Sequence, residues 1–187
     1  MKRIVTAVFA AIVAIGIGAS SASAQMANDP MVGGAAMSPK RDIIDNAMRS
    51  SDHTTLVAAV KAAGLVDTLK GKGPFTVFAP TNEAFAALPA GTVDSLLKPE
   101  NKAMLTKVLT YHVVAGNMDA AAIVSAIKKG GGTAKLKTVS GGTLMAMLDG
   151  DSVVLKDESG REARVTIADV RQSNGVIHVI DTVLLPK

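Results

Sequence analysis

The three histidines are the side chains best suited to metal binding or proton transfer. His53, His112 and His178 are far apart in the sequence, and none has a partner at the spacing of a motif such as H-E-x-x-H. The simplest interpretation of His112 and His178, which fall in apolar segments, is a buried imidazole hydrogen-bonded to the backbone or to a hydroxyl. A metal site and a pH-sensitive switch are the alternatives. The absence of cysteine excludes zinc fingers, iron–sulfur proteins and disulfide scaffolds.

No arrangement of nucleophile, base or phosphate-binding loop stands out. The chain has no G-x-S-x-G elbow and no P-loop, and no G-x-G-x-x-G precedes a helical pattern. Asp149, Asp151, Asp157 and Glu158 fall near expected hairpin tips, where carboxylates are normally solvated. We therefore expect no enzymatic activity, no cofactor and no metal.

The overall charge gives little indication of a partner. Lysine and arginine number 20 against 16 aspartates and glutamates, for a net charge of +4. The basic residues look scattered along the chain, and aromatic residues make up only 3% of it. A nucleic-acid-binding protein needs a basic surface and usually stacking aromatics, so we expect no nucleic-acid partner.

The remaining pattern predicts helices first and strands later. Apolar residues at helical spacing predict helices that begin near residues 41 and 55 and a helix over 101–109. Thr81, Thr92 and Asp119 are candidate N-caps for three more helices. Short β-branched or alternating runs predict strands over 75–78, 111–114, 134–139, 143–148, 152–157, 163–169 and 176–181. This order indicates an α+β domain.

The last strand and the turn before it carry the clearest local signals. Both faces of 176–181 are largely apolar, so this strand should be central in its sheet and covered on both sides. Asn174-Gly175, directly before it, is a dipeptide typical of tight turns.

The first 24 residues have the form of an export signal. Lys2 and Arg3 precede an uncharged, mostly apolar run, and Ala22-Ser23-Ala24 fits the small-residue cleavage rule. The run is too short to span a bilayer, so we expect a secreted protein, periplasmic or extracellular, with no membrane span in its mature form. Residues 25–40 show no apolar period and are expected to be a flexible leader, followed by one domain over 41–187.

Three stretches together resemble the fasciclin-like domain, an extracellular adhesion module. They are TVFAPTNEAF at 76–85, Tyr111-His112 followed by Val113-Val114, and NGVIHVIDTVLLP at 174–186. The stretch 55–69 is similar to the opening helices of the family, although His53 stands where an aromatic residue is expected. The resemblance implies a fold of N-terminal helices packed on a wedge of two small β-sheets.

The resemblance also implies partner-binding residues. An Asp-Ile dipeptide at the position of Asp169-Val170 is tied to integrin binding in family members that act as matrix proteins, and a Tyr-His stretch has a similar role in others. The candidates carried over to this chain are Asp169, Val170, Tyr111 and His112. The alternative for Asp169 is purely local, because an aspartate often closes a turn by bonding to its own backbone two residues on.

Taken together, these patterns predict a secreted, non-catalytic interaction module. It would mediate adhesion to a protein or matrix component at a cell surface, or to a biofilm. The first alternative is a carrier of an apolar ligand such as a carotenoid, which the resemblance implies because some fasciclin-like proteins bind carotenoids. Adaptable Met and aliphatic side chains, which suit such a ligand, are plentiful in this chain. A sugar-binding module is a further alternative, although the chain has no Trp on which a sugar could stack.

Overall fold

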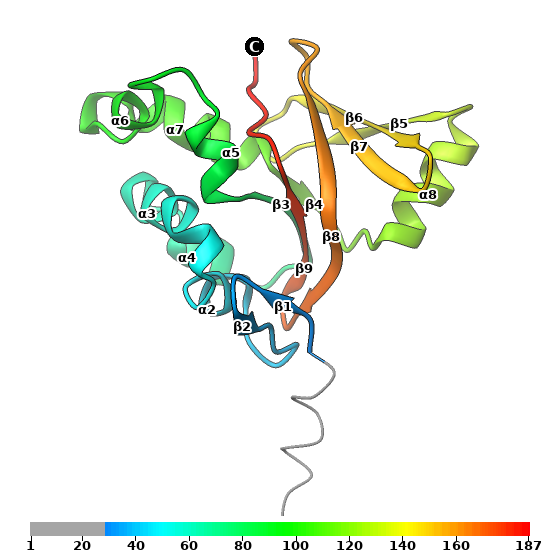
Figure 1. Ribbon diagram of the computed structural model, residues 1–187, viewed down its shortest axis with the longest axis horizontal. Coiled ribbons are helices and arrows are strands. Elements are labelled where there is room, and N and C mark those ends of the chain that lie inside the picture. The colour runs from blue at the N-terminus through cyan, green and yellow to red at the C-terminus, as the bar shows by residue number, and fades with distance from the viewer. Residues whose placement is uncertain (1–28) are drawn as a thin grey trace, which may run out of the picture.

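A seven-stranded sheet forms the centre of the computed structural model, which describes residues 29–187 (Figure 1). The expected export signal, 1–24, and the first four residues of the expected leader lie outside the described residues. The helices are α2 (Ile43–Ala47), α3 (Thr54–Ala63), α4 (Val66–Lys70), α5 (Asn82–Ala86), α6 (Thr92–Leu96), α7 (Lys102–Tyr111) and α8 (Ala120–Lys129). The strands are β1 (Met31–Val32), β2 (Ala35–Ala36), β3 (Phe75–Pro80), β4 (Val113–Ala115), β5 (Thr133–Lys137), β6 (Thr143–Asp149), β7 (Ser152–Lys156), β8 (Glu162–Gln172) and β9 (Gly175–Ile180).

The seven strands follow one another in the order β4-β3-β9-β8-β7-β6-β5. Strand β8 joins the β4-β3-β9 half of the sheet to the β7-β6-β5 half. Its residues Glu162–Arg164 pair with β7, and Val165–Gln172 pair with β9 across two register shifts. The edge strands also meet, at a single bridge between Val114 and Thr138. The α+β class is therefore confirmed. The expected pair of small β-sheets is instead a single seven-stranded sheet, because the bulged strand β8 pairs with both β7 and β9.

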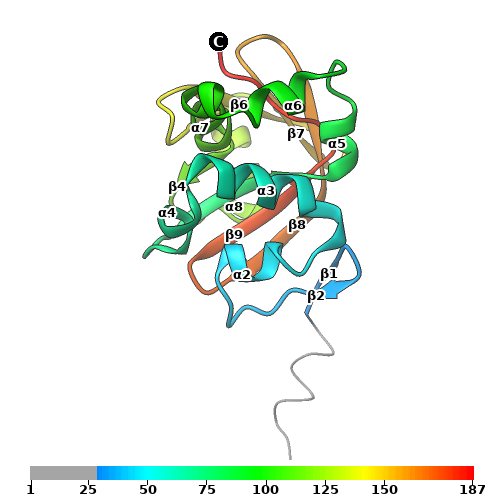
Figure 2. The ribbon, with the colours of Figure 1, turned by 90° about the vertical axis from the view of Figure 1, so that its left-hand side faces the viewer.

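Alternate residues of the central strands face two different hydrophobic cores. Val77 of β3 and Val179 of β9 belong to a core shared with helices α2–α7, which cover one side of these strands (Figure 2). Phe78 and Ile180 belong to a second core, enclosed by β5–β8 and α8. The prediction that 176–181 is a central strand covered on both faces is confirmed by its parallel pairing with β3 and antiparallel pairing with β8.

Two of the three expected helix caps are present. The side chain of Thr81 accepts a hydrogen bond from Ala84 N at 3.3 Å, and that of Asp119 accepts one from Ala122 N at 2.9 Å. Thr92 does not cap α6; it is already inside this helix, behind Gly91 with a φ of 79°.

The expected strand over 111–114 begins two residues later than predicted. Tyr111 is the last residue of α7, and His112 N still donates a helix-type hydrogen bond to Leu109 O at 3.1 Å. An apolar run this short has no period long enough to separate a helix end from a strand start.

The turn before β9 also differs from its prediction. Ser173 and Asn174 form the turn, and Gly175 is already paired in β9. A Cβ on Gly175 would lie 2.0 Å from the Phe75 carbonyl oxygen. The glycine is therefore required by the close approach of β3 and not by the turn itself.

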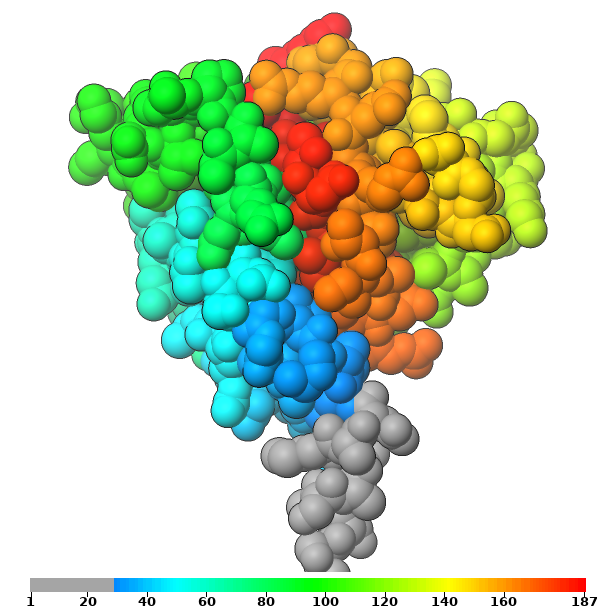
Figure 3. Space-filling view, viewed as in Figure 1, coloured from blue at the N-terminus to red at the C-terminus, as the bar shows by residue number. Residues whose placement is uncertain are grey.

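The expected leader is folded over much of its length. Residues 31–36 form the β1–β2 hairpin, which fills the space between the helices and β8 (Figure 3). Val32 and Met37 are buried in the helical core, and the Nδ2 atom of buried Asn46 donates to Ser38 O at 2.7 Å and to Gln172 Oε1. These contacts tie the segment to α2 and β8, so a flexible leader over 25–40 is wrong for this part.

We expect Asn46→Ala to lower the free energy of unfolding by about 2 kcal/mol, because it leaves buried polar partners without a hydrogen bond. Urea unfolding of the purified protein measures the change. Asn117→Ala is the control, because this exposed amide should contribute almost nothing. Equal stability of the two variants would contradict the role assigned to Asn46.

Candidate functional site

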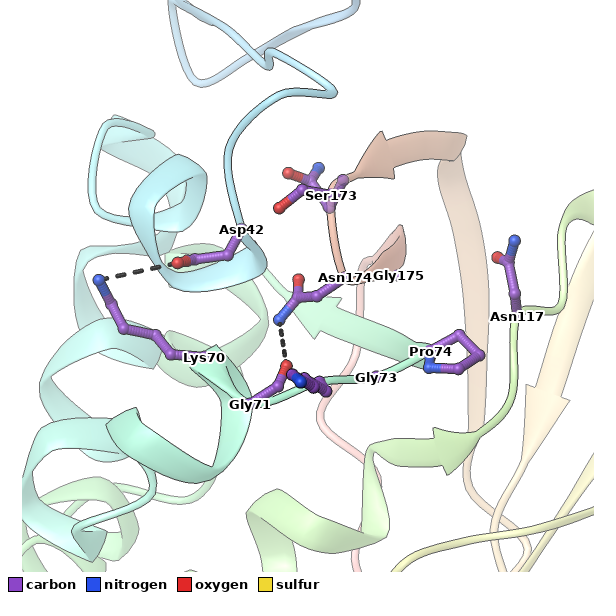
Figure 4. Close-up of a pocket in the computed structure, with 11 residues that line it drawn as sticks. Asp42, Lys70, Gly71, Gly73, Pro74, Asn117, Ser173, Asn174 and Gly175 are labelled. Atoms are coloured by element: carbon purple, nitrogen blue, oxygen red, sulfur yellow. Dashed lines mark hydrogen bonds and ion pairs between the residues drawn. The ribbon is translucent and has the colours of Figure 1, made fainter.

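A polar groove of about 560 Å³ lies at the end of the sheet where β8 turns into β9 (Figure 4). Its walls come from four parts of the chain: the start of α2, the segment between α4 and β3, the segment after β4, and the β8–β9 turn. The lining residues are Asp42, Lys70, Gly71, Lys72, Gly73, Pro74, Asn117, Gln172, Ser173, Asn174 and Gly175.

The Asn174 side chain holds three of these segments in place. Its Oδ1 accepts a hydrogen bond from Ile43 N at 3.1 Å, and its Nδ2 donates to Leu69 O at 2.7 Å and to Gly71 O at 3.2 Å. Backbone packing is equally tight here, since a Cβ on Gly73 would lie 2.0 Å from Asn174 O. The floor of the groove is therefore set by contacts between segments distant in sequence.

The charged groups along the groove are only partly compensated. Lys70 Nζ lies 2.6 Å from Asp45 Oδ1 and 3.7 Å from Asp42 Oδ2. The hydrogen bond to Asp45 is the main cause of a raised pKa for Lys70. Lys72 and Asn117 are exposed beside this ion-paired group, so they can contact a molecule bound in the groove.

Asp169 lies in the irregular part of β8 that leads toward this groove. It has a φ of 58°, the positive φ that aspartate tolerates better than most residues, between the register shifts at Ile167 and Val170. Its Oδ1 accepts a hydrogen bond from Ala120 N, the first residue of α8, at 2.6 Å. Asp169 is thus a second acceptor at the start of α8, beside the N-cap Asp119.

Behind Asp169, the buried side chain of His178 supports the bulge. Asp169 N donates to His178 Nδ1 at 3.4 Å, and His178 Nε2 donates to Met118 O at 2.8 Å. The imidazole stacks on Phe78 with ring centroids 5.6 Å apart, and burial lowers the pKa of His178. This neutral side chain connects β9 to the bulge and to the residues before α8.

The other three candidate residues are buried. Val170, 1% exposed, packs in the helical core, and Tyr111, 0% exposed, packs in the second core. The Tyr111 hydroxyl donates to Thr143 O at 2.9 Å and accepts from Glu158 N at 3.2 Å. Asp169 is therefore the one of the four whose side chain is partly exposed.

His112 is held by the backbone on both ring nitrogens. Nδ1 donates to Val108 O at 2.9 Å, and Nε2 accepts from Leu184 N at 3.1 Å. Burial lowers the pKa of His112 to about 4, although the hydrogen bond to Val108 and the charge of Asp157 act in the opposite direction. The expected buried, hydrogen-bonded imidazole is confirmed for His112 and His178.

Asp157 differs from its expected place at a solvated hairpin tip. It is 1% exposed, and its carboxylate accepts hydrogen bonds from Ser159 N, Arg161 N and Leu185 N at 2.8–3.0 Å. The carboxylate joins the β7–β8 turn to the segment after β9. Periodicity could not reveal this role, because the partner at Leu185 is distant in sequence.

The apolar interior offers little room for a ligand. An enclosed apolar cavity between the helices and β3 and β9 has a volume of about 30 Å³, whereas pockets for drug-sized ligands start at about 300 Å³. A carotenoid could enter this cavity only if the helices separated from the sheet.

Two further observations concern residues 29–187 alone. No helix there combines the length and the apolar character needed to cross a bilayer. Within the same range, no group of three or more histidine, aspartate or glutamate side chains is placed to hold a metal ion.

Comparisons with known proteins agree with this architecture. Protein sll1483 of Synechocystis sp. is 49% identical over 160 residues, which cover 83% of this chain and 79% of the relative. The cell surface glycolipoprotein MPB83 of Mycobacterium bovis is 34% identical over 163 residues, or 87% of this chain and 63% of the relative.

A solved structure shares the fold. The FAS1 domain pair of the insect cell adhesion molecule fasciclin I matches with a TM-score of 0.70 at 18% sequence identity, over 78% of this chain and 51% of that chain. The family model of the fasciclin domain matches residues 51–186. The expected resemblance is therefore confirmed, and the chain belongs to the fasciclin domain family.

Proposed function

We propose that this protein is an exported, non-catalytic interaction module that mediates adhesion to a component of a cell surface, matrix or biofilm. The observation that carries the proposal is the polar groove at the β8–β9 end, a recessed surface fixed by Asn174 and edged by exposed polar side chains. Fasciclin domains occur in a cell adhesion molecule and in a cell surface protein, which supports the same conclusion. His112 and His178, the groups best suited to chemistry, are engaged by the backbone.

We assign the direct contact to Asp169 and to the exposed side chains of the groove, Lys72 and Asn117. Val170, Tyr111 and His112 act indirectly in this proposal, by packing the bulge and the two cores that carry the surface. A partner with hydrogen-bonding groups and mixed charge would suit a groove that presents an amide, an ammonium and a nearby carboxylate.

We expect Asp169→Asn to weaken adhesion while changing the free energy of unfolding by less than about 1 kcal/mol. Asparagine keeps an acceptor for Ala120 N and tolerates a positive φ, so mainly the charge is lost. The measurement is dose-dependent retention of the labelled mature protein on intact cells and biofilm of its source organism.

Asp151→Asn is the matched control, because it removes the same charge at the exposed β6–β7 tip. Lys72→Ala together with Asn117→Ala tests the groove in the same assay and should also reduce retention. Retention that is equal for all three variants and the unsubstituted protein would refute this face as the adhesive surface.

A further inference from the structure

The charges of the chain are divided unevenly between its parts. The segment 120–148, which comprises α8, β5 and β6 up to Leu148, contains four lysines and no acidic residue, and Asp119 and Asp149 flank it directly. We call this segment the basic lobe; α8, β5 and β6 lie on the side of the molecule opposite to α3 and α6 (Figure 1). The rest of the described chain has 14 basic and 16 acidic residues. Positive charge is therefore concentrated in one segment of the chain.

The four lysines of the basic lobe, Lys128, Lys129, Lys135 and Lys137, are exposed. Within residues 29–187, the ion pairs involve other cations, namely Lys70, Lys156, Arg164 and Arg171. None of these ion pairs therefore involves a lysine of the basic lobe.

The register of the sheet shows how two of these lysines are arranged. Lys135 and Lys137 alternate with buried Ala134 and Leu136, so both point from β5 to the outer face of the sheet. Their positions along the strand differ by about 7 Å, the length of two residues. This spacing gives β5 a short row of positive charge.

The neighbouring strands carry ion pairs of their own and place no acidic side chain in register with Lys135. Lys135 is in register with Met145, which is in register with Lys156. Lys156 is paired with Glu162, and Arg164 is paired with Asp149. The β7–β8 side of the outer face is therefore locally neutralised. Lys135 and Lys137 take part in none of the ion pairs of residues 29–187. A carboxylate does lie at the end of their row, because Glu158 Oε1 accepts from Thr143 N, the register partner of Lys137, at 3.0 Å.

The composition of the basic lobe restricts what could bind there. It contains no aromatic residue, so it offers no ring for stacking on nucleic-acid bases and no aromatic anchor at a lipid interface. Besides lysines, the outer face of β5 and β6 presents the hydroxyls of Thr133 and Thr143, both partly exposed. Ammonium groups in a row with hydroxyls beside them suit a polymer that carries both carboxylate or sulfate groups and hydroxyls.

We propose that the outer face of β5, with Lys135 and Lys137, is a second binding surface, and that its ligand is a linear acidic polysaccharide. Binding would rest on charge and hydrogen bonds and not on sugar–aromatic stacking, which removes the objection raised by the absence of Trp. This surface shares no residue with the polar groove or with Asp169, so either assignment can fail without the other.

The test uses the mature protein and polygalacturonate, a linear polysaccharide with a carboxylate on each sugar, with uncharged dextran as the neutral probe. We expect binding to polygalacturonate that weakens steeply as salt is added, and no binding to dextran. Lys135→Gln with Lys137→Gln should weaken binding about tenfold, since two charge contacts are lost. Asp169→Asn should leave this binding unchanged.

The matched control is Lys98→Gln with Lys102→Gln, which removes two exposed positive charges from the segment of α6 and α7. A loss of affinity equal to that of the β5 pair would overturn the proposal, because net charge alone would then explain binding. Tighter binding to phosphatidylglycerol vesicles or to single-stranded oligothymidylate than to polygalacturonate would also overturn it.

Discussion

Replacing Tyr111 by alanine is expected to lower the free energy of unfolding by about 4 kcal/mol, within the range measured for removal of buried aromatic rings. The ring is fully buried in the second core and lies so close to Gly142 that a Cβ there would be 2.7 Å from Tyr111 Cε2. The substitution also removes the hydroxyl that bonds to Thr143 O and Glu158 N. Denaturant unfolding measures the loss.

Tyr111→Phe separates the ring from its hydroxyl. This variant keeps the packing and loses the two hydrogen bonds, so a decrease of about 1–2 kcal/mol is expected. Both variants should retain adhesion under conditions where they are folded. A folded Tyr111→Ala protein of unchanged stability that fails to adhere would instead place Tyr111 in the partner site.

Acidification is expected to destabilise the protein by about 3 kcal/mol through His112 alone. The pKa of His112 is about 4 in the folded state, against 6.5 for an exposed imidazole, and each pKa unit corresponds to about 1.4 kcal/mol. Between pH 6.5 and pH 4, the imidazole of His112 binds a proton in the unfolded chain but remains neutral in the folded protein. The stabilisation is therefore complete above pH 6.5 and is lost as the pH falls toward 4.

Urea unfolding at pH 7 and pH 4.5 measures this dependence, with His112→Gln as the comparison. Glutamine can hydrogen-bond but does not titrate, so the variant should be less stable at pH 7 and lose less stability on acidification. The lowered pKa values of His53 and His178 affect both proteins alike. Identical losses in the two proteins would rule out His112 as a main source of acid sensitivity.

Local signals in the sequence account for much of the fold. The caps at Thr81 and Asp119 and the two apolar faces of β9 were predictable, because each depends on a few neighbouring residues. The strands β5–β8 were likewise predictable from alternation and glycine-marked turns. The hairpin β1–β2 was not, since its two-residue strands are too short to show a period.

The candidate site was less predictable, because it is built from contacts between distant residues. Asp169 was a candidate from its sequence position, but its partner is Ala120 and not its own backbone. Asn174 looked like a turn residue, yet its amide joins α2 and α4 to the β8–β9 turn. Asp157 looked like a surface acid and is a buried link. Side-chain patterns report which face is apolar, but not which distant backbone group a polar side chain reaches.

The position of β9 between β3 and β8 has a consequence for the order of folding. This strand pairs with β3, 100 residues earlier in the chain, and adjacent residues just after it, Val183 and Leu184, each complete a different core. A nascent chain that stops short of these residues has neither core closed. Such long-range pairing makes folding slow and dependent on the nearly finished chain. The polypeptide therefore remains unfolded, and able to pass through a narrow pore, until its synthesis has passed β9.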